Sequence, residues 1–304
     1  MHVQSIWIVA FLGSLVCPTT ASLFWFSFGD SYSDTGFNVQ KLPTPENPMG
    51  SMDLNPNGYE NYIYFLTTQF NKTTVYNYNM ARSGASVSEK LSHNKNDDLL
   101  QQVQTWTDMI GGPYKMLRRG TPALASFWFG TNDIDLGVQK NLDRESYLSN
   151  VMDTYRQKIE EIRSHGISNI VLMNAGNITR TPSVIEAYAN NYTRLRQHAL
   201  MNAEFNKKLK AMYESLKAEH NDTKFLLYDS FSFFNKVLDA PEDYNFKNAT
   251  CVDDAEEQRN FSLNAYKETL GCPWRNDLHP GRRLNYFMAK DMSATVLQEL
   301  RIWS

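Results

Sequence analysis

Four short segments of the chain combine turn-forming glycines with side chains that could take part in catalysis. They read FGDSYSDTG, ARSGAS, FGTND and NDLHPG, and they carry Ser31, Gly84, Asn132 and His279 in that order. A serine hydroxyl becomes an effective nucleophile when a histidine takes its proton, and amide groups stabilise negative charge on a reacting oxygen. These residue types indicate acyl transfer if the fold brings the four segments together.

The surroundings of His279 distinguish it from the other histidines. It precedes Pro280 in a turn just ahead of an expected helix, so it is the candidate general base. Four other histidines occur in polar or helical stretches, and we expect them on the surface: His93, His165, His198 and His220.

Other residues near the four segments have expected supporting roles. Asp30 and Asp34 follow the first apolar run, and we expect them to brace its turn through hydrogen bonds to the backbone. Trp25 and Trp128 are expected in the core. Trp274 lies close in sequence to His279, and it could either line an acyl or sugar pocket or lie buried.

Short apolar runs and longer helical patterns alternate along the chain. Runs of strand length and composition occupy 23–28, 74–80, 126–129, 169–173 and 224–228. Helical patterns occupy 59–70, 97–110, 145–165, 185–219 and 282–301, and the fourth of these holds one long helix or two. This alternation predicts an α/β fold: a doubly wound three-layer sandwich with a five-stranded, mainly parallel sheet.

The first three catalytic candidates each follow a predicted strand. Open parallel sheets place their sites beyond the carboxyl ends of the strands, which is where Ser31, Gly84 and Asn132 would then lie. No internal repeat or linker divides the chain after its N-terminal segment, so we expect one domain over 22–304.

The four segments together resemble the blocks of the GDSL or SGNH hydrolases, which supply Ser, Gly, Asn and His in this order. The order and the strand context match over nearly the whole of the expected mature chain. The resemblance implies a flavodoxin-like sheet and serine esterase activity. The stretches GDSYSDTGFN and NPNGYENYIYFL look most like those of secreted fungal carbohydrate acetylesterases.

In this interpretation Ser31 attacks the acyl carbonyl after His279 takes its proton. The oxyanion would meet the backbone N–H groups of Ser31 and Gly84 and the side-chain amide of Asn132. Glycine suits such a position because it lets the backbone approach a ligand closely. Alternatively, Gly84 and Asn132 are plain turn residues.

The sequence departs from the family pattern at the residue that orients the histidine. The family places an aspartate three residues before it, whereas this chain has Asn276 there and Asp277 only two before. A carboxylate stabilises the imidazolium by its charge, whereas an amide fixes only the tautomer. We favour Asp277 for its charge, with Asn276 or a backbone carbonyl as alternatives.

The N-terminus indicates secretion. An apolar stretch from Ile6 to Cys17 leads to small residues around Ala21, which is typical of a signal peptide over 1–21 and too short for a comfortable membrane span; the alternative is a buried strand. Six glycosylation sequons agree with secretion: Asn71, Asn177, Asn191, Asn221, Asn248 and Asn260. In an oxidising compartment Cys251 and Cys272 would form one disulfide, the alternative being two free thiols.

Composition excludes several classes of function. The 304 residues are 42% hydrophobic and carry a formal charge of -3, without a basic run that would bind nucleic acid. No ligand spacing indicates a metal and no glycine-rich loop indicates a nucleotide, so we expect no cofactor.

We expect a monomeric, secreted esterase for short acyl groups, such as acetyl on hemicellulose saccharides. A lipase or phospholipase, or a silent glycan-binding protein of the same fold, are the alternatives.

Overall fold

A parallel sheet forms the centre of the molecule. The computed structural model describes residues 22–51, 60–87, 98–111, 121–253, 269–300 and 303, so the expected signal peptide lies outside the described residues. Five strands pair in the order β2-β1-β3-β4-β5, and all four pairings are parallel. The strands are β1 (Leu23–Gly29), β2 (Val75–Asn79), β3 (Ala123–Trp128), β4 (Asn169–Met173) and β5 (Lys224–Tyr228). The predicted fold class is confirmed.

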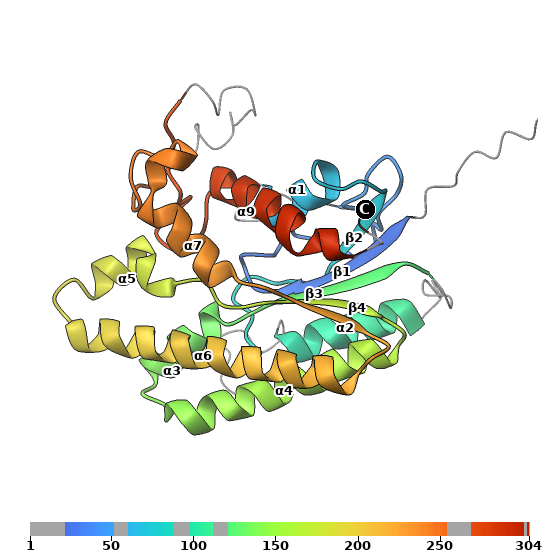
Figure 1. Ribbon diagram of the computed structural model, residues 1–304, viewed down its shortest axis with the longest axis horizontal. Helices are drawn as coiled ribbons and strands as arrows, with labels where there is room; N and C mark the ends of the chain where they lie inside the picture. The colour runs from blue at the N-terminus through green and yellow to red at the C-terminus, as the bar shows by residue number, and fades with distance from the viewer. Residues whose placement is uncertain are drawn as a thin grey trace, which may run out of the picture.

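Helices cover both faces of this sheet (Figure 1). One face carries α2 (Leu99–Gly111), α3 (Thr131–Gln139), α4 (Arg144–Ser164) and α6 (Tyr192–Glu219). The other face carries α1 (Tyr62–Thr68), α7 (Ser230–Asp239) and α9 (Arg282–Thr295). The short α5 (Pro182–Ala187) lies at one end of the sheet, and three 3₁₀ turns complete the described elements: Ile178–Arg180, Pro241–Tyr244 and Leu297–Glu299. Because both faces are covered, the strands are almost entirely buried.

Side-chain caps explain where several helices begin. Asp143 accepts a hydrogen bond from the Ser146 N–H and starts α4, whose apolar stripe is buried. The pattern over 185–219 is resolved into two helices, because Thr181 caps α5 and Asn191 caps α6. None of the helices within the described ranges is long and apolar enough to cross a bilayer.

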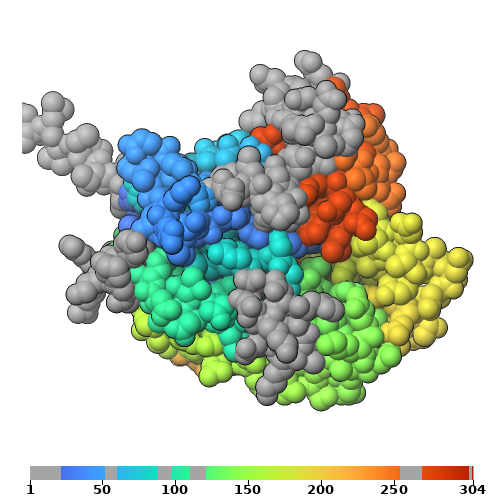
Figure 2. Space-filling view, turned by 180° about the vertical axis from the view of Figure 1, so that it is seen from behind, coloured from blue at the N-terminus to red at the C-terminus, as the bar shows by residue number. Residues whose placement is uncertain are grey.

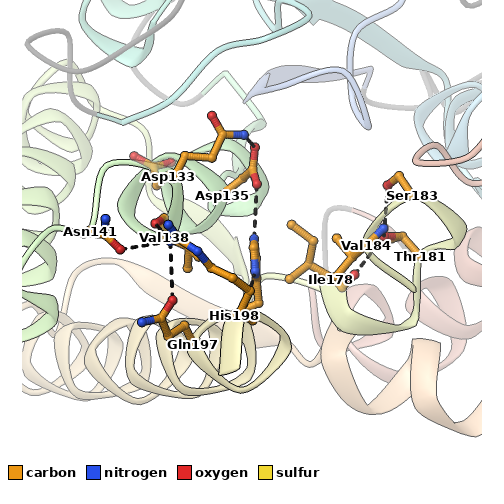
Figure 3. A network of polar contacts seen from close by, with 12 residues as sticks. Asp133, Asp135, Val138, Asn141, Ile178, Thr181, Ser183, Val184, Gln197 and His198 are labelled. Carbon is orange, nitrogen blue, oxygen red and sulfur yellow. Dashed lines mark hydrogen bonds and ion pairs between the residues drawn. The ribbon is translucent and has the colours of Figure 1, made fainter. Parts of the chain in front are cut away.

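The structure corrects one expectation about the histidines. His198 is fully buried between α6 and α3, where its Nε2 lies 3.1 Å from an oxygen of Asp135 and its Nδ1 lies 3.3 Å from the Arg194 carbonyl (Figure 3). It therefore joins two helices instead of facing solvent. His165 is exposed, His220 is partly buried beside Glu160, and His93 lies outside the described residues.

The strand order places three of the catalytic candidates at the carboxyl ends of neighbouring strands. Strand β1 lies between β2 and β3, so the segments that follow these three strands leave the sheet side by side. The chain passes from β1 to one neighbour and then crosses to the other. Such a reversal of strand order creates a crevice at the carboxyl ends of the strands.

Candidate active site

Ser31 lies in a tight turn directly after β1. The Ser33 N–H and the Asp34 N–H both donate to the Asp30 carbonyl, at 3.0 and 2.9 Å, and the Asp30 carboxylate accepts the Tyr32 N–H at 2.9 Å. Asp30 therefore braces the turn through the backbone, as the sequence predicts. Burial raises the pKa of this carboxyl to about 7, and the charge of the buried Asp133 nearby adds to the effect.

The last residue of β1 is held by a side chain that the sequence does not reveal. The Gln102 amide of α2 accepts the Gly29 N–H at 3.0 Å and donates to the Gly29 carbonyl at 2.7 Å. A Cβ at Gly29 would come within 2.9 Å of the Trp128 carbonyl, so only glycine fits here. Gln102 was missed because its position in a predicted helix gives no signal of this contact.

The structure brings His279 to Ser31 across 248 positions of sequence. The His279 Nε2 lies 2.8 Å from the Ser31 Oγ. The Tyr32 ring packs edge-to-face with the imidazole at a centroid distance of 5.7 Å, and the Tyr32 hydroxyl donates to the Leu278 carbonyl at 2.8 Å. The residue after the serine therefore holds the turn that carries the histidine.

Asn276 occupies the position beside the other ring nitrogen. Its Oδ1 lies 3.0 Å from the His279 Nδ1, and it also accepts the backbone N–H groups of Leu278 and His279 at 3.0 and 2.7 Å. Two backbone donors facing this atom require it to be the amide oxygen. Nδ1 must then carry the ring proton and donate it, which leaves Nε2 free to accept the Ser31 hydroxyl proton.

The preference for Asp277 does not agree with this geometry. The Asp277 side chain is exposed, and its backbone carbonyl accepts the Ser183 N–H of α5 at 2.7 Å. The turn presents the residue three before His279 to the ring and directs the next one to solvent. The structure therefore places Asn276, and not Asp277, beside Nδ1, since the backbone of the turn decides which side chain reaches that nitrogen.

The His279 imidazole is held in its neutral form. Burial lowers its pKa to about 4, and the Arg275 charge contributes in the same direction, whereas the Asp277 charge opposes it. A neutral imidazole can accept a proton, so this ring is available as a base down to mildly acidic pH.

Several contacts fix the segment that carries His279. Cys251 and Cys272 form the disulfide that the sequence favours, and the adjacent Trp274 is fully buried with its Nε1 donating to the Ala249 carbonyl at 2.7 Å. Trp274 therefore belongs to the core. In Figure 2 the red surface of this segment lies beside the blue surface that follows β1 and the yellow surface around α5.

Ser31, Gly84 and Asn132, which the sequence predicts as oxyanion donors, each have an N–H group without an acceptor in the described chain. Among the described residues, neither the Ser31 N–H nor the Gly84 N–H donates to a protein acceptor. Gly84 has a φ of +82°, which a side chain would strain, and the space where its Cβ would stand is open. One N–H of the Asn132 amide donates to the Ala85 carbonyl at 2.7 Å, and the described chain leaves the other unused.

A small pocket opens beside Ser31 and His279. Its volume is about 30 Å³, and the other lining residues are Tyr32, Asp34, Glu60, Asn61, Arg275, Pro280 and Asn285. This space holds about two water-sized groups. Glu60 is paired with Arg282 at 2.7 Å, so the charges at this side of the pocket are partly neutralised.

One group of potential metal ligands occurs elsewhere in the described part of the chain. It consists of Glu160, Glu219 and His220. Arg156 forms ion pairs with both glutamates and Arg163 with Glu160, so cations already balance the acidic groups. The group lies where β5 begins, at the opposite end of the sheet from Ser31.

The sequons differ in their exposure. Asn191, Asn221 and Asn248 are exposed, whereas Asn71 and Asn177 are partly buried and Asn260 lies outside the described residues. The amide nitrogen of Asn177 donates to Asn235 at 2.8 Å, and that of Asn71 donates to the Thr73 carbonyl at 2.8 Å. A glycan therefore meets the least hindrance at the three exposed positions.

Comparisons with known proteins agree with this geometry. The family described as GDSL-like lipase/acylhydrolase matches residues 26–292. An acetylesterase of Thermothelomyces thermophilus is 28% identical over 272 residues, which cover 87% of this chain and 85% of that protein. A GDSL esterase/lipase of Arabidopsis thaliana is 19% identical over 213 residues, or 64% of this chain and 59% of that protein. An acetylxylan esterase of Geobacillus stearothermophilus has the same fold, with a TM-score of 0.50 at 14% identity over 90% of this chain and 94% of that one.

Proposed function

Since the chain belongs to the GDSL-like lipase/acylhydrolase family and is a carboxylic ester hydrolase, we propose that Ser31, His279 and Asn276 form its catalytic triad. The observation that carries the proposal is the hydrogen-bonded line from Ser31 Oγ through the imidazole to Asn276 Oδ1, with distances of 2.8 and 3.0 Å. This line defines the direction of proton transfer, because Asn276 fixes the tautomer in which Nε2 is the acceptor.

The reaction proceeds in two steps. Ser31 Oγ attacks the acyl carbon while His279 Nε2 takes the hydroxyl proton, and the developing oxyanion accepts hydrogen bonds from the N–H groups of Ser31, Gly84 and Asn132. The alcohol leaves with the proton from His279 and an acyl-serine remains. Water then attacks the acyl carbon with His279 again as the base, which releases the carboxylic acid and restores Ser31.

We propose acetyl as the preferred acyl group and acetylated hemicellulose saccharides as the substrate class. The small volume of the pocket beside Ser31, about 30 Å³, supports a short acyl chain. The relatives named acetylesterase and acetylxylan esterase support the same choice. We expect the reaction to need no cofactor.

The rates of hydrolysis of p-nitrophenyl acetate, butyrate and palmitate test the acyl preference. We expect kcat/KM to fall with each increase in chain length, and we expect acetate release from acetylated xylo-oligosaccharides. The control is Ser31→Ala, which should lack both activities. Faster cleavage of palmitate would favour a lipase instead.

We also propose that the protein is secreted and glycosylated. The N-terminal pattern, the six sequons and the Cys251–Cys272 disulfide support this proposal. In a eukaryotic host the product should appear in the medium without residues 1–21, and deglycosylation should lower its apparent mass. A product retained in the cytosol with its N-terminus intact would overturn the proposal.

A further inference from the structure

We propose that Asp34 is a positioning residue that holds the Ser83–Gly84 peptide in place, so that the Gly84 N–H faces the oxyanion. This inference rests on the proposed function, in which Gly84 is an oxyanion donor. It assigns the second aspartate of the first segment a role beyond its own turn.

The Asp34 carboxylate joins two segments that follow different strands. Its Oδ1 accepts the Gly36 N–H at 2.8 Å, which closes the turn after β1. Its Oδ2 accepts both the N–H and the hydroxyl of Ser83, each at 2.9 Å. Asp34 lies three positions after Ser31 in the same turn, so one carboxylate couples the nucleophile's turn to the residue just before Gly84.

The segment around Gly84 is held on its other side by α3. Asn132 donates to the Ala85 carbonyl at 2.7 Å, and the Asp133 carboxylate accepts the Val87 N–H at 3.0 Å. The Ser83–Gly84 peptide therefore lies between two anchors, Asp34 before it and the start of α3 after it. Without the first anchor, the contacts with α3 and the 3.1 Å bond from the Ala85 N–H to the Arg82 carbonyl still hold the peptide. If the peptide rotates on these remaining contacts, its N–H no longer faces the oxyanion.

Local packing does not replace this anchor. Gly84 adopts a φ of +82°, and no atom of the described residues, its two chain neighbours aside, lies within 4 Å of the position its Cβ would take. Gly84 is therefore positioned by the hydrogen bonds of its neighbouring residues and not by packing of other side chains against it. A bond to a charged acceptor is stronger than one between neutral groups, which suits a carboxylate for this task.

The chemistry of the contact explains why an amide cannot substitute. The two carboxylate oxygens face three donors, which are the Gly36 N–H, the Ser83 N–H and the Ser83 hydroxyl. In Asp34→Asn one oxygen becomes an NH₂ group, so at least one backbone donor meets another donor. The side chain keeps its size, and only the hydrogen bonding changes.

The test compares Asp34→Asn with Asp143→Asn, a matched control. Asp143 also accepts the N–H and the hydroxyl of one serine, Ser146, at 3.0 and 2.8 Å, but it does so at the start of α4, on a different segment from the nucleophile. With p-nitrophenyl acetate, Asp34→Asn should lower kcat by about 10- to 100-fold, below the loss that follows removal of an oxyanion donor, with KM within about twofold. Asp143→Asn should keep kcat and change only the melting temperature.

A boronic acid inhibitor separates positioning from general damage. It forms a tetrahedral adduct with the serine that mimics the transition state, so its affinity for Asp34→Asn should fall by the same factor as kcat/KM. If Asp34→Asn does not fold, Ser83→Ala provides the test, since it loses one of the three bonds and should lower kcat by about fivefold at unchanged KM.

The outcomes separate the two proposals. An unchanged kcat in a folded Asp34→Asn, or in Ser83→Ala when that variant is needed, overturns the inference about Asp34. So does an equal loss in Asp143→Asn. If the wild type does not cleave the ester, or if Ser31→Ala retains activity, the proposed function fails instead.

Discussion

Asn276 gives this chain a neutral residue where its family pattern has an aspartate. Its oxygen accepts three hydrogen bonds, two of them from the backbone, so it fixes the orientation of His279 without adding a charge. A carboxylate would stabilise the imidazolium and raise its pKa. At the residue scale, the consequence is a base that stays neutral at low pH.

The pH dependence of kcat/KM tests this consequence. The base must be neutral to act, so activity is present above its pKa and is lost as pH falls through it. Since burial lowers the pKa of His279 to about 4, the wild type should keep most of its kcat/KM at pH 5. Asn276→Asp should move the acidic limb to higher pH by about one to three pH units, because an adjacent opposite charge favours the imidazolium. If the acidic limb of the kcat/KM profile does not move in Asn276→Asp, the result would contradict the role of Asn276.

The unused amide N–H of Asn132 leads to a second prediction at the residue scale. Asn132→Ala should lower kcat by about 10²- to 10³-fold with little change in KM, because its free N–H acts mainly in the transition state. The melting temperature should be measured in parallel, since Asn132 also binds the Ala85 carbonyl. Unchanged turnover would reduce Asn132 to a turn residue.

At the scale of elements, the segment between the disulfide and α9 carries the histidine. The Gly281 N–H donates to the Pro273 carbonyl at 2.7 Å and the Arg275 N–H donates to the His279 carbonyl at 2.9 Å, so the segment forms a closed loop. The disulfide ties the start of this loop to Cys251, and Ser183 of α5 holds its far side through Asp277. The position of His279 therefore depends on elements outside its own loop.

Removal of the disulfide should affect both stability and activity. The double variant Cys251→Ser/Cys272→Ser releases a link over 21 positions, which should lower the free energy of unfolding by about 3 kcal/mol. Because the same link holds the His279 loop, kcat at a temperature where the variant is fully folded should also fall. Denaturant titration and steady-state kinetics give the two values. A full kcat in the folded variant would mean that the loop is fixed without the disulfide.

Strands were easier to predict than the elements next to the site. The five apolar runs correspond to β1 to β5 because buried parallel strands need continuous apolar sequence, although β3 begins three residues before its predicted start, at Ala123–Leu124–Ala125. Helix α3 was missed because its first residues, Thr131 to Asp133, have the composition of a turn. Helix α7 was missed because its serines and phenylalanines gave no clear helical period.

Within the site, the sequence also predicted some contacts and not others. The sequence motifs predicted which serine and histidine meet, because they occur at the ends of recognisable elements. Motifs could not decide between Asn276 and Asp277, because that choice depends on the backbone of a single turn. The contacts of Gln102 and Ser183 were also invisible, since residues far apart in sequence make them.

At the scale of the whole molecule, the sheet buries acidic groups beneath the site. Asp30 is 2% exposed and Asp133 is fully buried, and the hydroxyls of Tyr32 and Tyr62 have raised pKa values because of burial. A folded-state pKa of about 7 for Asp30, against 3.8 for the unfolded chain, means that folding favours its protonated form. Its ionisation therefore lowers stability as pH rises from about 4 through 7.

Asp30→Asn should remove this dependence. The variant keeps an oxygen for the Tyr32 N–H but cannot ionise, so it should be more stable than the wild type at pH 8 and similar to it at pH 4. The raised pKa corresponds to a difference on the order of 4 kcal/mol at high pH. Thermal denaturation of both proteins across this range measures it. Equal pH profiles would show that Asp30 is ionised in the folded protein.

The central claim is that Ser31 is a nucleophile activated by His279, and covalent labelling tests it most directly. A fluorophosphonate reacts with an activated serine and stays attached, so peptide mapping by mass spectrometry identifies the residue. We expect one equivalent of label on Ser31, and no label in Ser31→Ala. In a folded His279→Ala the rate of labelling should be strongly reduced. Labelling of a different residue, or no labelling of a protein that cleaves p-nitrophenyl acetate, would contradict the account.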